Sequence, residues 1–475
     1  MNSEPRRRSQ TLKMLATTGG LTLGVIGLTV MTAGASPPAQ AEVEKASQVA
    51  ERAAASEASI RTLKLDTASD RASGAGSDHA SNLVAAAERF RPLDFPEVPD
   101  NWEDAGLDLQ KAETNDQGEL VQELPDGSRV VFTVDPDTQR YLDSVLASRP
   151  VPHGGVVMLE PETGRVLAMS EDSASASPDY QNFTRNARPP SASIFKVVTA
   201  AALMSEAGQG RHQEVCYHGG TRGLTQRNIT GDPNLDNRCD DLEGALALSI
   251  NSLIAKQTYH HLEPDDLLQW AERFGYNTPI PFELPVEPST ASFGDDPYEV
   301  ARAAAGFWHT HMSPLHGAMI AASIANDGVM MAPSLIERYE SPEGEVLAEF
   351  RPEVFREVME PQLARQLDDM MEATASRGTA RNYFGQQPRF PNDIRVSGKT
   401  GTLSNQRPFL RFTWFVGTGH HRQWDDHSGV AVAGLMANEP EWHMVGPQVA
   451  SKALRQYFRV ESARRSVEED AVVSR

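Results

Sequence analysis

The sequence predicts an α+β fold, in which one antiparallel sheet is flanked by helices and carries an inserted, mainly helical subdomain. Two apolar runs separated by Glu-Pro-Glu-Thr-Gly predict a hairpin over 154–170. Three apolar segments near the C-terminus, 394–402, 411–417 and 429–436, are typical of strands. A long, mainly helical stretch separates the two groups, so we expect the hairpin and the three late strands to meet in one sheet.

A strand followed by a helix precedes the hairpin. The segment RVVFTVDPDTQRYLDSVLASR predicts a strand, a turn at Asp135 and Pro136, and a helix capped by Asp135 or Asp137. Apolar periodicity predicts three further helices, over 196–207, 361–378 and 447–458. These helices would cover the faces of the sheet.

Composition divides the chain into five predicted segments. They are a signal peptide or membrane anchor (1–41), an Ala/Ser-rich tether (42–93), a short N-terminal docking segment (94–129), a packed domain (130–461) and a disordered tail (462–475). The packed domain is large enough to contain the whole predicted sheet and its helices.

The N-terminus has the pattern of an export signal. Residues 1–13 contain three adjacent arginines, 14–35 are mostly apolar, and the small-x-small triplet at 39–41 predicts cleavage before Glu42. The apolar run also approaches the roughly 20 residues that cross a bilayer, so an uncleaved anchor is the alternative. Either interpretation predicts an exported protein, in the periplasm or on the extracytoplasmic face of the inner membrane.

Charge and cysteines narrow the function classes. The formal net charge of −21 argues against a nucleic-acid partner. Cys216 and Cys239 suit an oxidising compartment and predict a disulfide, with free thiols or a metal site as alternatives. Only His218 lies near as a further ligand, so we expect no metal and no cofactor. The other histidines are expected to be structural or exposed, including His260, His261, His309, His311, His420 and His421.

Lys196 stands three residues after Ser193 in an otherwise apolar stretch. The chain contains 36 arginines and only 8 lysines, and lysine, unlike arginine, can lose its proton at an accessible pKa. At a helix start, residues three apart lie on one face, so the amine could take the proton of the hydroxyl and activate it as a nucleophile. A solvated lysine beside a helix-capping serine is the alternative interpretation.

A second lysine begins the run Lys399, Thr400, Gly401 and Thr402 on a predicted strand. Small hydroxyl residues and glycine beside a cation would give a strand edge that pairs with an extended peptide and holds its carboxylate. The alternative is an ordinary bulge or turn at Gly398 and Gly401.

The triplet from Ser249 to Asn251 falls at a predicted break between two helices. Read alone, it is an ordinary interruption. However, Ser-x-x-Lys, Ser-x-Asn and Lys-Thr-Gly-Thr follow one another along the chain, with 56 residues from Ser193 to Ser249 and 150 from Ser249 to Lys399. This spacing suits a helical insertion between the two halves of a sheet.

Together these motifs resemble those of penicillin-binding protein transpeptidase domains and serine β-lactamases. The resemblance covers about 130–460, which would make the packed domain 130–461 a transpeptidase domain with the penicillin-binding transpeptidase fold. Further similar stretches are FTVDPDTQ, GGVVMLEPETGRVLAM, SPLHGAMIAASIANDGVMMAPSL and GTARNYF.

The resemblance implies a role for each residue of the first two motifs. Ser193 would attack the carbonyl between two D-alanines and form an acyl-enzyme, with Lys196 as its base. Ser249 would relay protons toward the leaving amine, and Asn251 would bind the substrate amide.

The third motif would complete the site. Lys399 would set the local potential and shuttle protons, while Thr400 and Thr402, with Gly401 between them, would bind the substrate and its terminal carboxylate. Backbone N–H groups of Ser193 and Thr402 would form the oxyanion hole.

The resemblance therefore implies an exported D,D-transpeptidase that cross-links peptidoglycan stem peptides, is inhibited by β-lactams and works beside other proteins of cell-wall synthesis. A D,D-carboxypeptidase or a serine β-lactamase would share the acylation residues. Ser-x-Asn rather than Ser-x-Val argues against an oxacillin-hydrolysing β-lactamase. A non-catalytic module that binds β-lactams or peptidoglycan is the alternative from another class, and the intact nucleophile and base argue against it.

Overall fold

A computed structural model describes residues 98–99, 101–175, 177–220, 223–385, 390–407, 409–424 and 429–473. They belong to one compact unit over 90–475. The predicted signal peptide or anchor and the predicted tether lie outside the described residues. Among the described residues, no helix has the length and apolar character needed to span a membrane.

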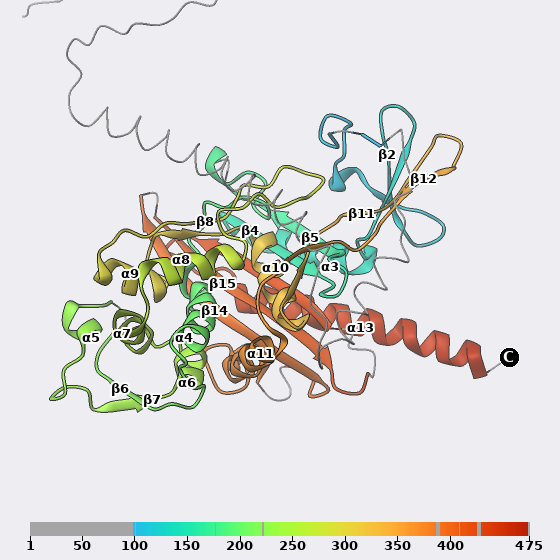
Figure 1. Ribbon diagram of the computed structural model, residues 1–475. Coiled ribbons are helices and arrows are strands. Elements are labelled where there is room, and N and C mark those ends of the chain that lie inside the picture. The colour runs from blue at the N-terminus through green and yellow to red at the C-terminus, as the bar shows by residue number, and fades with distance from the viewer. Residues whose placement is uncertain are drawn as a thin grey trace, which may run out of the picture. The chain divides into compact units, whose positions relative to one another are not determined.

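A five-stranded antiparallel sheet in the order β14-β15-β16-β4-β5 forms the centre of this unit (Figure 1). Its strands are β4 (His153–Leu159), β5 (Val166–Asp172), β14 (Ile394–Gln406), β15 (Phe409–His421) and β16 (Gly429–Asn438). Ala433 of β16 lies opposite Val157 of β4, so the early hairpin and the late strands meet in one sheet. The predicted α+β fold and strand grouping are confirmed, and β14 is an edge strand.

Each face of this sheet has its own apolar core, because successive side chains along a strand point to opposite faces. On β15, Trp414 and Val416 pack into the core that includes α10, whereas Phe415 packs into the core that includes α13. The helices that flank the sheet are α3 (Pro136–Ala147), α10 (Pro314–Ala325), α11 (Pro361–Ser376) and α13 (Gly446–Val473). Asp135 caps α3 by accepting a hydrogen bond from the Thr138 amide at 2.7 Å, which confirms the predicted cap.

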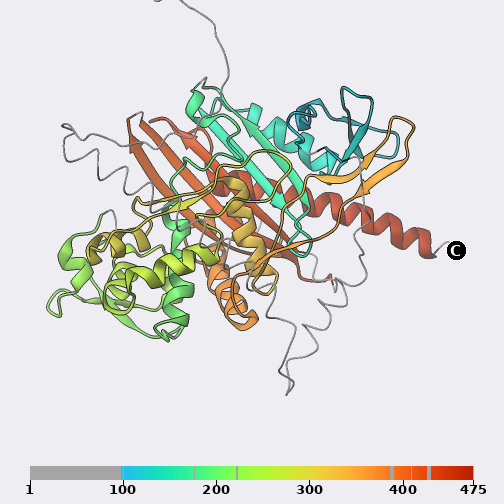
Figure 2. The same ribbon diagram turned by 45° about the horizontal axis from the view of Figure 1, so that its top comes forward.

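The helical insertion gathers at one end of the sheet, between β5 and α10 along the chain (Figure 2). Its helices are η3 (Ala192–Phe195), α4 (Lys196–Ser205), α5 (Gln226–Thr230), α6 (Leu242–Ala247), α7 (Asn251–His261), α8 (Pro264–Arg273) and α9 (Pro297–Ala304). A short pair, β6 (Val215–Tyr217) and β7 (Arg238–Asp240), places Cys216 opposite Cys239. The two cysteines form the predicted disulfide. Glu214 lies close to both sulfur atoms, but the sulfurs of a disulfide are not thiolate ligands, so these three residues do not form a thiolate metal site.

A second five-stranded sheet lies at the other end (Figure 2). Its order is β1 (Glu113–Thr114), β2 (Leu120–Glu123), β3 (Arg129–Phe132), β11 (Ile336–Glu340) and β12 (Val346–Glu349). The predicted docking segment, 94–129, thus supplies β1 and β2, and β3 joins them to β11. Val130 of β3 lies opposite Tyr339 of β11. The remaining short elements are η1 (Leu109–Lys111), η2 (Pro178–Tyr180), β8 (Thr290–Ala291), β9 (Thr310–His311), β10 (Val329–Met331), β13 (Val354–Glu357) and α12 (Arg381–Phe384).

The C-terminal tail differs from the prediction. We expected 462–475 to be disordered, but α13 continues to Val473. Glu461 pairs with Arg465 one turn later, at 3.1 Å, and Arg464 forms an ion pair with Asp135. Charge pairs at this spacing stabilise an exposed helix, and the contact with Asp135 ties it to the start of α3.

Candidate active site

Ser193 and Lys196 lie where the 3₁₀ turn η3 runs into α4. The Lys196 Nζ donates hydrogen bonds to Ser193 Oγ at 2.7 Å, to Asn251 Oδ1 at 2.7 Å and to the Ala305 carbonyl at 2.5 Å. All three acceptors are neutral oxygens, and the lysine is 0% exposed. Two of the three predicted motifs therefore meet at a single amine.

Burial lowers the pKa of Lys196 well below its usual value of 10.5, and the nearby positive charge of Lys399 lowers it further. A neutral amine is an acceptor for a proton, whereas an ammonium is not. The geometry and the direction of the pKa shift together allow Lys196 to act as a base toward the Ser193 hydroxyl.

The second motif lies at the break between α6 and α7, as predicted. Ser249 has a φ of +56°, in the left-handed region that ends one helix before the next begins. This turn directs the Ser249 Oγ toward Lys399, whose Nζ donates to it at 3.0 Å. Asn251 is the first residue of α7 and accepts the hydrogen bond from Lys196.

The third motif lies on the edge strand β14, and its lysine is not on the exposed surface of that edge. Lys399 is 0% exposed and donates to Ser249 Oγ and to the Thr400 carbonyl at 2.8 Å. Burial lowers its pKa to about 7. Thr402, by contrast, is exposed, and Thr400 is partly exposed.

A cavity of about 370 Å³ joins the three motifs. Six of the eight predicted site residues line it, namely Ser193, Ser249, Asn251, Thr400, Gly401 and Thr402. Lys196 and Lys399 lie behind its wall and bond to residues that line it. A larger cavity of about 730 Å³ lies elsewhere, between α3 and residues 106–112, and contains none of the eight.

Thr379 also lines the cavity and was not predicted. Its Oγ1 lies 2.5 Å from Thr400 Oγ1, and its backbone amide donates to the Ala247 carbonyl at 3.0 Å. A Cβ at Gly378 would lie 2.1 Å from that same carbonyl, so glycine lets the end of α11 approach α6. The stretch GTARNYF marked this place in the sequence, but no spacing connected Thr379 with Thr400.

Gly306 is a second unpredicted feature of the site. Its φ is +90°, and a Cβ there would lie 2.2 Å from the Ala192 carbonyl and 2.8 Å from the Ser193 amide. Glycine therefore allows the chain after α9 to pack against η3. This contact brings the Ala305 carbonyl to Lys196.

Comparison with known proteins agrees with this arrangement. The family model described as the penicillin-binding protein transpeptidase domain matches residues 154–424, more than half of the chain. The chain is 28% identical over 311 residues to the peptidoglycan D,D-transpeptidase PbpA of Mycolicibacterium smegmatis, covering 59% of this chain and 62% of that protein. It is 27% identical to the penicillin-binding protein PbpB of the same organism, covering 60% of this chain and 46% of that protein. The chain thus spans less than two thirds of either relative.

Solved structures show the same fold. The D,D-transpeptidase domain of a peptidoglycan glycosyltransferase from Eggerthella lenta aligns with a TM-score of 0.59 at 23% identity, covering 77% of this chain and 92% of that one. The imipenem acyl-enzyme complex of penicillin-binding protein A from M. tuberculosis aligns with a TM-score of 0.57 at 23% identity, covering 69% and 79%. The resemblance seen in the sequence motifs and the predicted fold are both confirmed.

Proposed function

Because this chain belongs to the penicillin-binding protein transpeptidase family, we propose that it is an exported D,D-transpeptidase that cross-links peptidoglycan stem peptides through an acyl-enzyme on Ser193. The observation that carries the proposal is the contact between the fully buried Lys196 amine and the Ser193 hydroxyl, at 2.7 Å, on the wall of an open cavity. The disulfide and the predicted export signal at 1–41 support the location outside the cytoplasm.

Acylation begins with the neutral Lys196. It takes the proton of Ser193 as the Oγ attacks the carbonyl carbon between the two D-alanines, and an Oγ–C bond forms. The charge on the substrate oxygen is stabilised by the Ser193 and Thr402 amides. The Lys196 ammonium then has three acceptors within 2.7 Å, which hold it while the tetrahedral intermediate lasts.

Collapse of the intermediate breaks the C–N bond and releases the terminal D-alanine. Its amine needs a proton, and Ser249 relays one, because its hydroxyl lies 3.0 Å from Lys399, whose pKa is about 7. The terminal carboxylate binds the hydroxyls of Thr400 and Thr402, and Asn251 holds the substrate amide. Thr379 supports binding of the carboxylate, because its hydroxyl bonds to the Thr400 hydroxyl and so fixes its position.

The amine of a second stem peptide then attacks the acyl-enzyme carbonyl: a new C–N bond forms, the Oγ–C bond breaks and the Lys196 ammonium returns its proton to Ser193 Oγ. The proton that the attacking amine loses passes through Ser249 to Lys399. A D,D-carboxypeptidase or a β-lactamase would use water at this step. β-Lactams would act as inhibitors by acylating Ser193. The similar penicillin-binding protein A of M. tuberculosis forms an acyl-enzyme complex with imipenem.

A labelled penicillin tests this proposal. We expect one stable adduct per chain, mapped to Ser193 by mass spectrometry and abolished in Ser193→Ala. Ser191→Ala is the matched control, because Ser191 is fully buried and accepts a hydrogen bond from Tyr276 at 3.1 Å. Absence of an adduct on Ser193 would overturn the proposal, and rapid release of hydrolysed drug would indicate a β-lactamase instead.

A further inference from the structure

Three polar residues follow one face of α7, the helix that begins at Asn251. Ser252, Lys256 and His260 are four residues apart, and this spacing places them in a line along the helix. Each of them bonds to the segment closed by the Cys216–Cys239 disulfide, which we call the clamp segment (residues 216–220 and 223–239). The segment therefore holds α7 along its whole length.

The contact nearest the active site is made by Ser252. Its Oγ donates to the Gly219 carbonyl at 3.1 Å, and the residue is fully buried. Gly220 packs so closely that a Cβ there would lie 2.4 Å from the Ser252 Cβ. Ser252 directly follows Asn251, the residue that accepts a hydrogen bond from Lys196.

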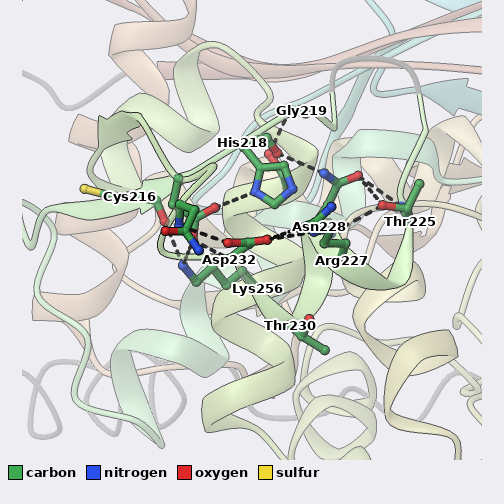
Figure 3. Close-up of polar contacts among 12 residues, drawn as sticks. Cys216, His218, Gly219, Thr225, Arg227, Asn228, Thr230, Asp232 and Lys256 are labelled. Atoms are coloured by element: carbon green, nitrogen blue, oxygen red, sulfur yellow. Dashed lines mark hydrogen bonds and ion pairs between the residues drawn. The ribbon is translucent and has the colours of Figure 1, made fainter.

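The central contact is an ion pair between Lys256 and Asp236, at 2.6 Å, with only 7% of the Asp236 side chain exposed. Lys256 also donates to the Cys216 carbonyl at 2.9 Å. The Asp236 carboxylate has two further partners, His218 Nδ1 at 2.5 Å and the Asp232 amide at 3.1 Å. Figure 3 shows Lys256 beside Cys216 and Asp232 of the clamp segment.

The start of α7 needs such support. It follows the strained turn at Ser249, and Ile250 at the N-cap position supplies no side-chain hydrogen bond to the first turn. Contacts from outside the helix must therefore fix the position of Asn251. The far end of α7 is held as well, where His260 Nε2 lies 3.0 Å from the Thr230 carbonyl.

We propose that Lys256 and Asp236 are positioning residues for acylation: through the clamp segment they fix the first turn of α7 and so hold Asn251 Oδ1 against the Lys196 amine. This inference rests on the proposed function, since it assigns the pair a role in the acylation step. Neither residue of the pair lines the cavity, so the pair would act on Lys196 through the position of Asn251.

The test is the double variant Lys256→Met/Asp236→Asn in the full chain, because removing both charges leaves neither buried alone. Penicillin acylation is measured as the rate constant at saturating drug and as the dissociation constant of the pre-covalent complex. We expect the rate constant to fall about 10- to 100-fold, as for a catalytic group displaced by about 1 Å, with little change in the dissociation constant.

The pH profile separates positioning from simple loss of stability. The groups that face Lys196 are Ser193, Asn251, the Ala305 carbonyl and Lys399. Withdrawal of Asn251 alone removes one acceptor from the ammonium form, so the acid limb of the acylation profile should move to lower pH. Partial unfolding alone would lower the acylation rate by the same factor at every pH and would leave the acid limb at the same pH.

Arg227→Met is the matched control, because it removes an ion pair with Asp232 inside the clamp segment and should leave acylation unchanged. Ser252→Ala offers a milder second variant if the double variant does not fold, with a smaller fall of about threefold or more. A wild-type acylation rate and an unmoved acid limb in the double variant, or in Ser252→Ala where the double variant does not fold, would overturn the inference.

Amide hydrogen exchange over 251–255 provides a readout that does not depend on acylation. Faster exchange there in the double variant, with the control unchanged, supports the clamp, and unchanged exchange overturns it. If the wild-type chain never forms a penicillin adduct, yet the double variant shows faster exchange over 251–255 than the wild-type chain, the proposed function is refuted while the clamp stays in place.

Discussion

Replacement of Lys196 by arginine tests whether Lys196 acts as a base or only supplies a positive charge. Arginine carries a fixed positive charge beside Ser193 and can donate to the same oxygens, Asn251 Oδ1 and the Ala305 carbonyl. It cannot, however, give up its proton at a working pH. We therefore expect Lys196→Arg to lose acylation by penicillin.

The size of the loss follows from the protonation state and from burial. Because arginine keeps its proton far above any working pH, its side chain is neutral at pH 7.5 in only about one molecule in 10⁵. Because the amine of Lys196 is fully buried, bulk water has no access to take its place beside the Ser193 hydroxyl. General-base catalysis contributes about 10²- to 10⁴-fold, so the acylation rate constant should fall by at least that range.

The assay is the rate of adduct formation with a labelled penicillin, followed at several pH values. Lys452→Arg, a half-buried lysine on α13, is the control for the substitution itself and should acylate normally. Thermal unfolding shows whether the guanidinium is accommodated in the site. Acylation by Lys196→Arg within about tenfold of wild type, from a folded protein, would refute the assignment of Lys196 as the base.

Two further predictions concern stability. Lys399 has a pKa of about 7 in the folded protein and about 10.4 when unfolded, so the unfolded chain binds more protons between these values and stability should rise with pH from about 7 to about 10. Lys399→Met should reduce that slope in urea titrations at a series of pH values, and an identical slope would contradict the shift. Gly306→Ala should cost about 2–4 kcal/mol of unfolding free energy, because the backbone has a φ of +90° and the new Cβ would lie 2.2 Å from the Ala192 carbonyl. Gly294→Ala, with open space at the Cβ position, should be nearly neutral in the same chemical denaturation, and equal losses for the two variants would contradict the argument.

The main sheet could be predicted because its signals are local. The strands over 394–402, 411–417 and 429–436 are apolar runs bounded by polar turns, and the hairpin over 154–170 has its turn residues between two such runs. The order of these segments along the chain then limits how they can pair. Because a long helical insertion separates the hairpin from the late strands, the two groups must meet for one sheet to form. The structure extends each of the late strands but does not change the grouping.

The close contacts around the site could not be predicted, because they depend on how distant segments approach. Gly306 contacts η3, more than 100 residues earlier, and Thr379 meets Thr400 only because α11 ends against α6. The prediction that the tail after 461 is disordered is wrong for a similar reason, because Arg464 forms an ion pair with Asp135, which is far away in the sequence. The spacing of Ser252, Lys256 and His260 was present in the sequence, but it has meaning only once the partner segment is known.

The choice of acceptor decides what a buried lysine can do. Lys256 faces the carboxylate of Asp236, which balances an ammonium charge. Lys196 and Lys399 face neutral oxygens, so burial is not offset and their pKa values are lowered. The amide of Asn251 holds the Lys196 amine in place without stabilising its charge as a carboxylate would. An aspartate at 251 would keep nearly the same shape yet favour the ammonium form, and the amine would no longer be free to accept the Ser193 proton. The second motif thus needs an amide for an electrostatic reason, and the clamp on α7 is useful because it holds that amide at bonding distance from a neutral amine.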